Sequence, residues 1–520
     1  MSRLHSGEAD ARERGVVKRR RSGGRAGRNP AISSRGPAGR AIPSYEILTA
    51  EALERIEAQA DWILQEIGIE FRGDDIALSL FRESGATVNG ATVRFDPGHV
   101  RALCSTAPSE FTLHGRDASK NVRIGGSNLV LMPGYGSPFV TDLDRGRRYA
   151  SLEDFHNFVR LTYMSPWLHH SGGTVCEPVD VPVNKRHLDM VHAHLTQSTK
   201  PFMGGVTSAS RASDSIEMTR IVHGADFVDK NAVVQANINV NSPLVYDDTM
   251  SAALRVYAAA NQCVAVSPAI FGGAMGPLGP AAMAAQTLAE GMVGIALTQL
   301  VRPGCPCVFG SFHSTMNLKS GALTFGSPEA NLTTFALAQL GRHLGVPVRS
   351  GGGQLTAANA GDGQAMQEST SAMWAAILSG ANQVWHAAGW LEGGLTMSYE
   401  KFVMDLDHCG AMIRMVQGFS TDTEAMGRDA YKEVGPGQNF LSTAHTLRHF
   451  RDANFLPELP EAGPYETWVE AGSKTLEQRA NARWKTMLDS YEKPPLDPGV
   501  AEALDDYAAR RKSEMKDKWY

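Results

Sequence analysis

Short runs of apolar and β-branched residues alternate with longer segments of helical periodicity between about residue 128 and residue 420. Eight such pairs can be counted, and most of the apolar runs end in glycine or another small residue. Strands that alternate with helices predict parallel βαβ units, and eight units close a barrel. The pattern therefore predicts an α/β protein, a (β/α)8 TIM barrel whose active site lies at the carboxyl ends of the strands.

The predicted strands cover residues 129–132, 168–172, 202–206, 233–240, 264–271, 307–312, 346–349 and 383–387. Three helix starts carry clear capping signals. Ser151 and Asp154 form a capping-box pattern, Ser327 precedes a proline at the first turn, and Asp362 precedes a helix over 363–378. These signals fix where three of the helices begin.

We expect four regions along the chain: a disordered basic tail (1–42), an N-terminal α+β layer (43–125), the barrel (126–420), and a C-terminal helical segment packed on it (421–520). The tail carries eleven Lys and Arg against three Asp and Glu, about +8. The net charge is −5, so the remainder is about −13. A solvated arm is expected of such a tail, with transient contact to nucleic acid or an acidic partner as the alternative. For the protein as a whole we expect no nucleic-acid partner.

The cysteines and the hydropathy bear on location. Six cysteines are scattered along the chain without a secretion signal, which predicts reduced thiols and a cytoplasmic protein. No uninterrupted apolar run approaches the roughly 18–20 residues that span a bilayer, so we expect no membrane association. A homo-oligomer is expected only because most soluble assemblies of this kind are symmetric.

Metal and nucleotide sites find little support in the motifs. His187, His192 and His194 lack the i, i+4 spacing of a helical zinc pair, so we expect no metal bound directly by this chain. The glycines at 351–353 match neither dinucleotide nor phosphate-loop motifs. Glycine there is better explained by a sharp turn or the close approach of a bulky ligand.

Aromatic side chains gather at the predicted carboxyl ends of the strands. Four of them are expected to form a cage: Tyr135, Phe271, Phe312 and Trp390. A trimethylammonium group has no N–H to donate, and aromatic faces bind it through cation–π attraction. Packing in the core is the alternative for each ring.

Three polar side chains at or near the same ends suit a carboxylate on such a substrate: His313, Arg349 and His386. Arg349 offers the best geometry because its guanidinium binds a carboxylate with two parallel hydrogen bonds. A structural ion pair with an acidic neighbour is the alternative for Arg349. The sequence thus indicates a small zwitterionic ligand.

The eight-fold pattern and three segments together resemble the trimethylamine:corrinoid methyltransferase superfamily. The segments are 271–277 (Phe-Gly-Gly-Ala-Met-Gly-Pro), 310–317 (Gly-Ser-Phe-His-Ser-Thr-Met-Asn) and 351–353 with Asp362, Gln364 and Glu368. Residues 354–359 hold only standard amino acids, so the chain resembles the branch without pyrrolysine. That branch includes enzymes that act on quaternary amines such as glycine betaine.

The resemblance implies methyl transfer from a quaternary amine to the cobalt of a corrinoid (cobalamin), free or carried on a separate protein. It also implies that Gly351, Gly352, Gly353 and Gln354 border the corrin, with no protein nucleophile. Asp362, Gln364 and Glu368 match the family motif, either touching a ligand or capping and bracing a helix. Two other functions stay open: methyl transfer to a folate acceptor, and binding of quaternary amines without catalysis.

Overall fold

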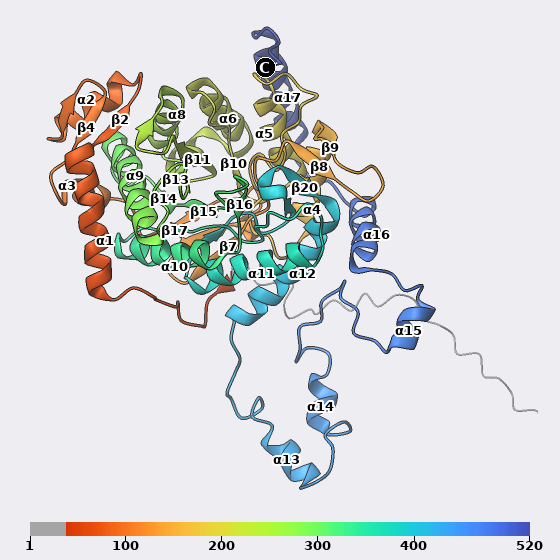
Figure 1. The fold of residues 1–520 in the computed structure, drawn as a ribbon. Coiled ribbons are helices and arrows are strands. Elements are labelled where there is room, and N and C mark those ends of the chain that lie inside the picture. Colours follow the sequence, from red (N-terminus) through yellow and green to blue (C-terminus); the bar gives the residue numbers. More distant parts are fainter. Residues whose placement is uncertain (1–37, 520) are drawn as a thin grey trace, which may run out of the picture.

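The computed structural model describes residues 38–519, which form an α/β protein around one parallel sheet (Figure 1). Seven parallel strands lie in the order β7, β18, β17, β14, β13, β11, β10. Their bounds are β7 (Asn128–Leu131), β10 (Phe202–Met203), β11 (Val234–Val240), β13 (Cys263–Phe271), β14 (Cys307–Gly310), β17 (Val348–Arg349) and β18 (Gln383–Val384). All seven lie within or next to predicted strands. Because the strands are parallel, their carboxyl ends share one edge.

Helices follow the strands and surround the sheet (Figure 1). Their bounds are α4 (Leu152–Met164), α5 (Arg186–Gln197), α6 (Ala209–His223), α7 (Ala225–Lys230), α8 (Asp248–Ala259), α9 (Pro280–Val301), α10 (Pro328–His343), α11 (Gly363–Leu378) and α12 (Tyr399–Val416). The predicted capping box of Ser151 and Asp154 is present, and Ser327 and Asp362 cap α10 and α11 as predicted. Helix α9 alone among the described helices is long and apolar enough to cross a membrane, but 89% of the relevant window is buried inside the protein.

The second predicted strand, 168–172, is extended but not a regular strand. It lies between β7 and β10: the amide of His169 donates to Leu131 (2.9 Å), and the amide of Met203 donates to Gly172 (2.8 Å). The imidazole Nδ1 of His169 accepts the Leu131 amide (3.0 Å) in place of a backbone carbonyl. A side chain thus replaces part of the hydrogen-bond ladder, which the residue pattern alone does not reveal.

The N-terminal layer is α+β. It contains α1 (Ala50–Trp62), a π-helical turn (Ile63–Ile67), β2 (Ile69–Phe71), α2 (Asp75–Glu83), β3 (Thr87–Asn89), β4 (Thr92–Arg94), α3 (His99–Cys104), β5 (Glu110–Leu113), a 3-10 turn (Ala118–Lys120) and β6 (Val122–Gly125). Strand β12 (Val245–Tyr246) pairs with β2, and α1, α2 and α3 pack on α9. This layer therefore covers one side of the main sheet.

The expected tail boundary at residue 42 is too late. Strand β1 (Ala38–Gly39) pairs antiparallel with β7, and the amide of Ala41 donates to Val416 (2.8 Å). Residues 38–42 are therefore part of the fold, because backbone pairing can order a segment that has no apolar pattern. The rest of the predicted tail lies outside the described residues.

Smaller strands lie beyond the carboxyl ends of the main sheet. Strand β15 (Phe312–Met316) extends the pairing of β13 and joins β16 (Leu323–Thr324). A four-stranded sheet combines β8 (Phe139–Thr141), β9 (Arg148–Tyr149), β19 (Trp390–Leu391) and β20 (Thr396–Ser398), with a 3-10 turn at Glu392–Gly394. The loops that follow the strands are thus fixed by pairing among themselves.

Residues after α12 form two groups of helices, one packed on the main body and one that extends away from it. Helix α16 (Leu476–Asp489) packs on α4 and α12, and α17 (Pro498–Ser513) packs on α5 and α6. Helices α13 (Arg428–Val434), α14 (Ala444–His449) and α15 (Tyr465–Glu470) instead extend away from the main body (Figure 1). We call residues 419–474 the arm; only Ala430, Thr443 and Leu459 are buried in it.

Candidate functional site

Aromatic rings meet above the carboxyl ends of β13, β14, β17 and β18. The ring of Phe312 lies 6.0 Å from that of Phe271 and 5.9 Å from that of Trp390, measured between centroids. Phe312 leaves the sheet through β15, whereas Trp390 begins β19. The structure therefore brings together three of the four rings that the sequence predicted for a cage.

Trp385 connects the fourth ring to this group. Its ring centroid lies 6.2 Å from that of Tyr135, which follows β7, the strand next to β18. The guanidinium of Arg349 lies 4.5 Å from the Trp385 centroid and 5.5 Å from that of Phe312. Arg349 thus stands between the two halves of the aromatic group.

The guanidinium of Arg349 is buried with few partners. It is 2% exposed, its Nη1 donates to the carbonyl of Ser311 (2.6 Å), and its Nη2 lies 3.4 Å from Nε2 of His386. Its Nε has no hydrogen-bond partner, and no carboxylate of the described residues pairs with it. Burial lowers the pKa of Arg349 to about 9, so the side chain is charged at neutral pH. The alternative of a structural ion pair is not observed.

His386 has an unusual backbone. Its φ is 56°, in the left-handed region that non-glycine residues rarely adopt. That conformation sets its ring 4.2 Å from the ring of Trp390 and 5.4 Å from that of Phe312. Burial keeps the pKa of His386 well below its usual value, and the charge of Arg349 lowers it further. His386 is therefore neutral and accepts a hydrogen bond from Arg349, and its strain is typical of functional positions.

Buried polar atoms without partners concentrate at this place. Among the described residues they include Nε of Arg349, Nδ1 of His386, Nε1 of Trp390, Oδ1 of Asn237 and Oγ of Ser267. Asn237 and Ser267 lie on β11 and β13, toward the same ends of the sheet. A buried polar atom left unpaired costs about 1–3 kcal/mol, so an accumulation of such atoms is typical of a site for a polar ligand.

His313 lies near Arg349 but directs its Nε2 away from the rings, and its Nδ1 is buried without a hydrogen-bond partner. Its Nε2 lies 2.9 Å from Oγ1 of Thr334 and 3.1 Å from the carbonyl of Ala330, both on α10. Successive side chains of a strand point to opposite faces, so His313 faces the helix because Phe312 faces the rings. Burial lowers the pKa of His313 to about 4 and the charge of Arg349 lowers it further, so the imidazole is neutral, and its contact with a carboxylate stays a prediction.

Known proteins are similar to this chain over most of its length. Residues 16–516 match the sequence model of one family, described as Trimethylamine methyltransferase (MTTB). The chain belongs to the trimethylamine methyltransferase family. The resemblance seen in the sequence segments is thereby confirmed.

Relatives within the trimethylamine methyltransferase family cover nearly the whole chain. A glycine betaine methyltransferase of Desulfitobacterium hafniense (strain Y51) is 40% identical over 478 residues, 92% of this chain and 99% of the relative. A proline betaine:corrinoid methyltransferase of Eubacterium limosum is 27% identical, covering 86% of this chain and 93% of its own. The trimethylamine methyltransferase MttB of Methanosarcina barkeri is 26% identical, covering 87% and 92%.

The segment that the family resemblance assigned to the corrin is buried. Gly351, Gly352, Gly353 and Gln354 are all inaccessible, and Nε2 of Gln354 lies 2.8 Å from Nδ1 of His408 on α12. A Cβ on Gly353 would lie 3.0 Å from Ala387, so this glycine permits close packing of two loops. Corrin contact at these residues stays a prediction, and it would require the segment to move.

The three residues of the family motif brace a helix. The carboxylate of Asp362 accepts from the amides of Gln364 and Ala365 at the start of α11. Gln364 donates to Glu368 (2.9 Å), and the other oxygen of Glu368 accepts from the hydroxyl of Thr356 (2.7 Å) and the amide of Ala357. Of the two roles considered for this family motif, the observed contacts are those of a cap and brace.

Sequence reasoning missed two elements that shape the site. Trp385 is one residue before His386 and was assigned only to a strand, although an aromatic at a strand end was the signal used elsewhere. Lys401 and Asp405 form a fully buried ion pair on α12 (2.8 Å), and Asp405 accepts the amide of Gly389 (2.9 Å). Their i, i+4 spacing is too common in helices to have indicated this role.

Proposed function

We propose that this chain is a methyltransferase that moves a methyl group from a quaternary amine bearing a carboxylate to the cobalt of a corrinoid carried on a partner protein. Glycine betaine is the first candidate donor. Identity of 40% with a glycine betaine methyltransferase over nearly the full length supports the reaction class. The observation that carries the donor class is the buried guanidinium of Arg349, which has no carboxylate partner among the described residues.

The two charges of such a donor fit the two kinds of side chain at the site. A carboxylate would pair with Arg349 along the edge formed by Nε, which has no partner, and Nη2, whose one partner is His386 at 3.4 Å. The trimethylammonium group would lie among the rings of Phe312, Trp385, Trp390 and Tyr135, held by cation–π attraction. Phe271 packs against Phe312 and supports it from outside.

The reaction requires no nucleophile from the protein. The N–CH3 bond breaks with its electron pair remaining on nitrogen, so the leaving group is a neutral tertiary amine. The corrinoid, which is the methyl acceptor, supplies the nucleophilic electron pair in its reduced cobalt(I) form. The chain has to hold the donor in line, exclude water and balance the carboxylate charge, which the burial of Arg349, His386 and Trp390 favours.

We also propose that the sheet closes into the predicted (β/α)8 barrel. The extended segment 168–172 would be the eighth strand, because its backbone donates to Leu131 on β7 and accepts from Met203 on β10. In that arrangement the site would be the mouth of the barrel.

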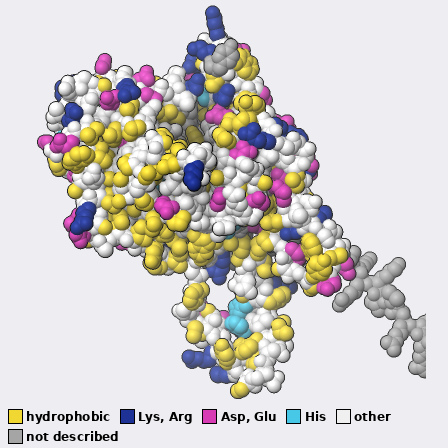
Figure 2. Space-filling view, in the orientation of Figure 1, with side chains coloured by type: hydrophobic (Ala, Val, Ile, Leu, Met, Phe, Trp, Pro, Cys, Tyr) yellow, Lys and Arg dark blue, Asp and Glu magenta, His cyan; other side chains and the backbone are white. Residues whose placement is uncertain are grey.

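We also propose a cellular location and an oligomeric state for the protein. All six cysteines are free and buried, in agreement with a cytoplasmic enzyme. We propose a homo-oligomer assembled through the arm, whose large apolar side chains are strongly exposed, as Figure 2 shows. The most exposed are Phe419 (85%), Leu441 (80%), Leu456 (70%), Tyr465 (70%) and Tyr431 (68%). Patches of this kind normally mark a protein interface.

The test is methyl transfer to cobalamin. Purified protein, reduced cob(I)alamin and one donor at a time are mixed without oxygen, and methylcobalamin is followed by absorbance. The donors are glycine betaine, proline betaine, carnitine, choline and trimethylamine. We expect turnover with a betaine and none with choline or trimethylamine, since both lack a carboxylate for Arg349.

Other outcomes distinguish the alternatives. Turnover that appears only when a corrinoid protein is added would identify that protein as the required acceptor. Methyl transfer to tetrahydrofolate without any corrinoid would replace the proposal by a folate-dependent reaction. Saturable betaine binding by calorimetry with no acceptor ever methylated would instead identify a binding protein.

A further inference from the structure

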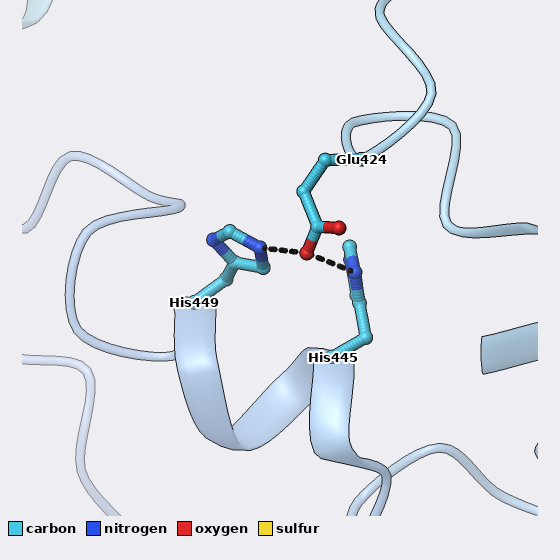
Figure 3. Close-up of side chains that lie close together, drawn as sticks. All are labelled: Glu424, His445 and His449. Carbon is cyan, nitrogen blue, oxygen red and sulfur yellow. Dashed lines mark hydrogen bonds and ion pairs between the residues drawn. The ribbon is translucent and has the colours of Figure 1, made fainter. Parts of the chain in front are cut away.

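Two histidines and a glutamate converge on the arm, far along the chain from the substrate site. Helix α14 carries His445 and His449 on one face, four residues apart, and Glu424 reaches them from the segment before α13 (Figure 3). One ligating atom from each side chain lies within 4.8 Å of the other two. Oε1 of Glu424 lies 2.8 Å from Nε2 of His449 and 3.6 Å from Nδ1 of His445.

The spacing of these atoms suits a small metal ion. Two imidazole nitrogens and a carboxylate oxygen at about 2.0–2.2 Å from zinc would be about 3.3 Å apart in a tetrahedral site. The guanidinium of Arg448 also donates to Oε1 of Glu424 (2.7 Å). Every hydrogen bond that the Glu424 carboxylate accepts among the described residues ends on Oε1, so Oε2 is free to bind an ion while Arg448 stays in place.

The arm has little hydrophobic core of its own to hold its short helices together. It has three buried residues in 419–474, and its helices α13 and α14 have seven and six residues. Short helices without a core are marginal in water, and small units of this kind are usually stabilised by disulfides or metals. All six cysteines lie outside the arm, so no disulfide is possible there.

We propose that Glu424, His445 and His449 bind one zinc-like divalent transition-metal ion that fastens α14 to the segment before α13. Imidazole ligands favour zinc and similar metals over magnesium or calcium, which prefer oxygen. Three protein ligands leave a fourth position for water. The expectation of a chain without a metal of its own rested on histidines outside the arm, such as His187, His192 and His194, whereas His445 and His449 form an i, i+4 pair on the arm.

The first experiment titrates zinc chloride into full-length protein, prepared with a chelator and without a histidine tag, by calorimetry. We expect one ion per chain, with affinity reduced by roughly a hundredfold or lost in Glu424→Gln, His445→Gln and His449→Gln. The matched control is His343→Gln, because His343 forms a comparable exposed pair with Glu57 (2.8 Å) but has no third ligand. This control should bind zinc like the unchanged protein.

A second measurement separates binding from folding. Limited proteolysis should cut the metal-free arm and spare the zinc-loaded arm, and cobalt(II) should give the visible absorption of a tetrahedral site. Equal zinc affinity in the three variants and in the control would overturn the proposal. So would the absence of stoichiometric binding, whatever the result of the methyl-transfer assay, since neither readout depends on that activity.

Discussion

The substrate site and the arm are incomplete in opposite ways. At the site, polar atoms of Arg349, His386 and Trp390 are buried without partners. On the arm, apolar side chains such as Leu441 and Leu456 stand in solvent without cover. Buried polar atoms without partners suit a small polar ligand, whereas an exposed apolar surface suits another macromolecule. The kind of group left unpaired therefore indicates the kind of partner.

The strongest test of this comparison is Arg349→Met. Removing the guanidinium takes away the partner proposed for the carboxylate, and losses of this kind cost about 2–5 kcal/mol. We expect kcat/KM for glycine betaine to fall by roughly a hundredfold or more in the methylcobalamin assay. Arg220→Gln is the matched control, because Arg220 lies on an outer helix with Glu217 and Asp229 as partners. Equal losses in both variants would contradict the assignment.

The buried histidines of the main body predict that its stability falls as the pH is lowered. Burial lowers the pKa of His194 and His313 to about 4 and that of His170 and His386 well below the usual value. The unfolded histidines titrate near 6.5, so the unfolded state binds more protons as pH falls from above 6.5 toward 4. At pH 6.5 this costs about 0.4 kcal/mol for each histidine, or roughly 1.6 kcal/mol for the four, relative to alkaline pH. Urea unfolding at pH 7.5 and 6.5 measures the loss; equal stability would show that they are protonated when folded.

The arm is tested by Leu441→Ser. If Leu441 is buried between two copies, its loss costs about 1.5 kcal/mol, or roughly a tenfold weaker association. Sedimentation equilibrium measures the association constant. Ile76→Ser removes a similarly exposed side chain (56%) from α2 and should change nothing. A monomer at all concentrations, which gains a partner only when a corrinoid protein is added, would assign the arm to that protein instead.

The smallest effect is expected for one ring of the cage. Phe312→Leu keeps an apolar side chain but removes the aromatic face, worth about 1 kcal/mol for a bound cation. We expect KM for glycine betaine to rise roughly fivefold, while Phe312→Tyr keeps the ring and the affinity. An unchanged KM in the leucine variant would mean that the trimethylammonium group lies against Trp385 and Tyr135 alone.

Much of the α/β pattern was predictable because each signal is local. Asp362 caps α11 over the same residues, 363–378, that the sequence predicted, since a cap needs only the next turn. The segment 168–172 was not predictable in detail, because the imidazole of His169 accepts an amide hydrogen bond from a strand 38 residues away. Nor was the pairing of residues 38–39 with β7, which depends on backbone groups and not on side-chain pattern.

The sequence predicted which residues lie at the site better than it predicted where their side chains point. The rings of Phe271, Phe312 and Trp390 lie together because strand ends in a parallel sheet share one edge, which a sequence reveals. His313 turned to α10 because it is one residue from Phe312, and a shift of one position reverses the face. The structural role of Asp362 and Glu368 depends on Thr356 and Ala357, whose positions no motif gives.

The ion pair on α12 has a consequence for biosynthesis. Lys401 and Asp405 hold the carbonyl of Gln354 and the amide of Gly389, and these two groups belong to the loops that carry the site. A ribosome delivers Arg349, Trp385 and Trp390 before it delivers α12. A nascent chain that ends before residue 399 therefore contains every ring of the cage but lacks the helix that sets their spacing. The site is therefore complete only after α12 has left the ribosome.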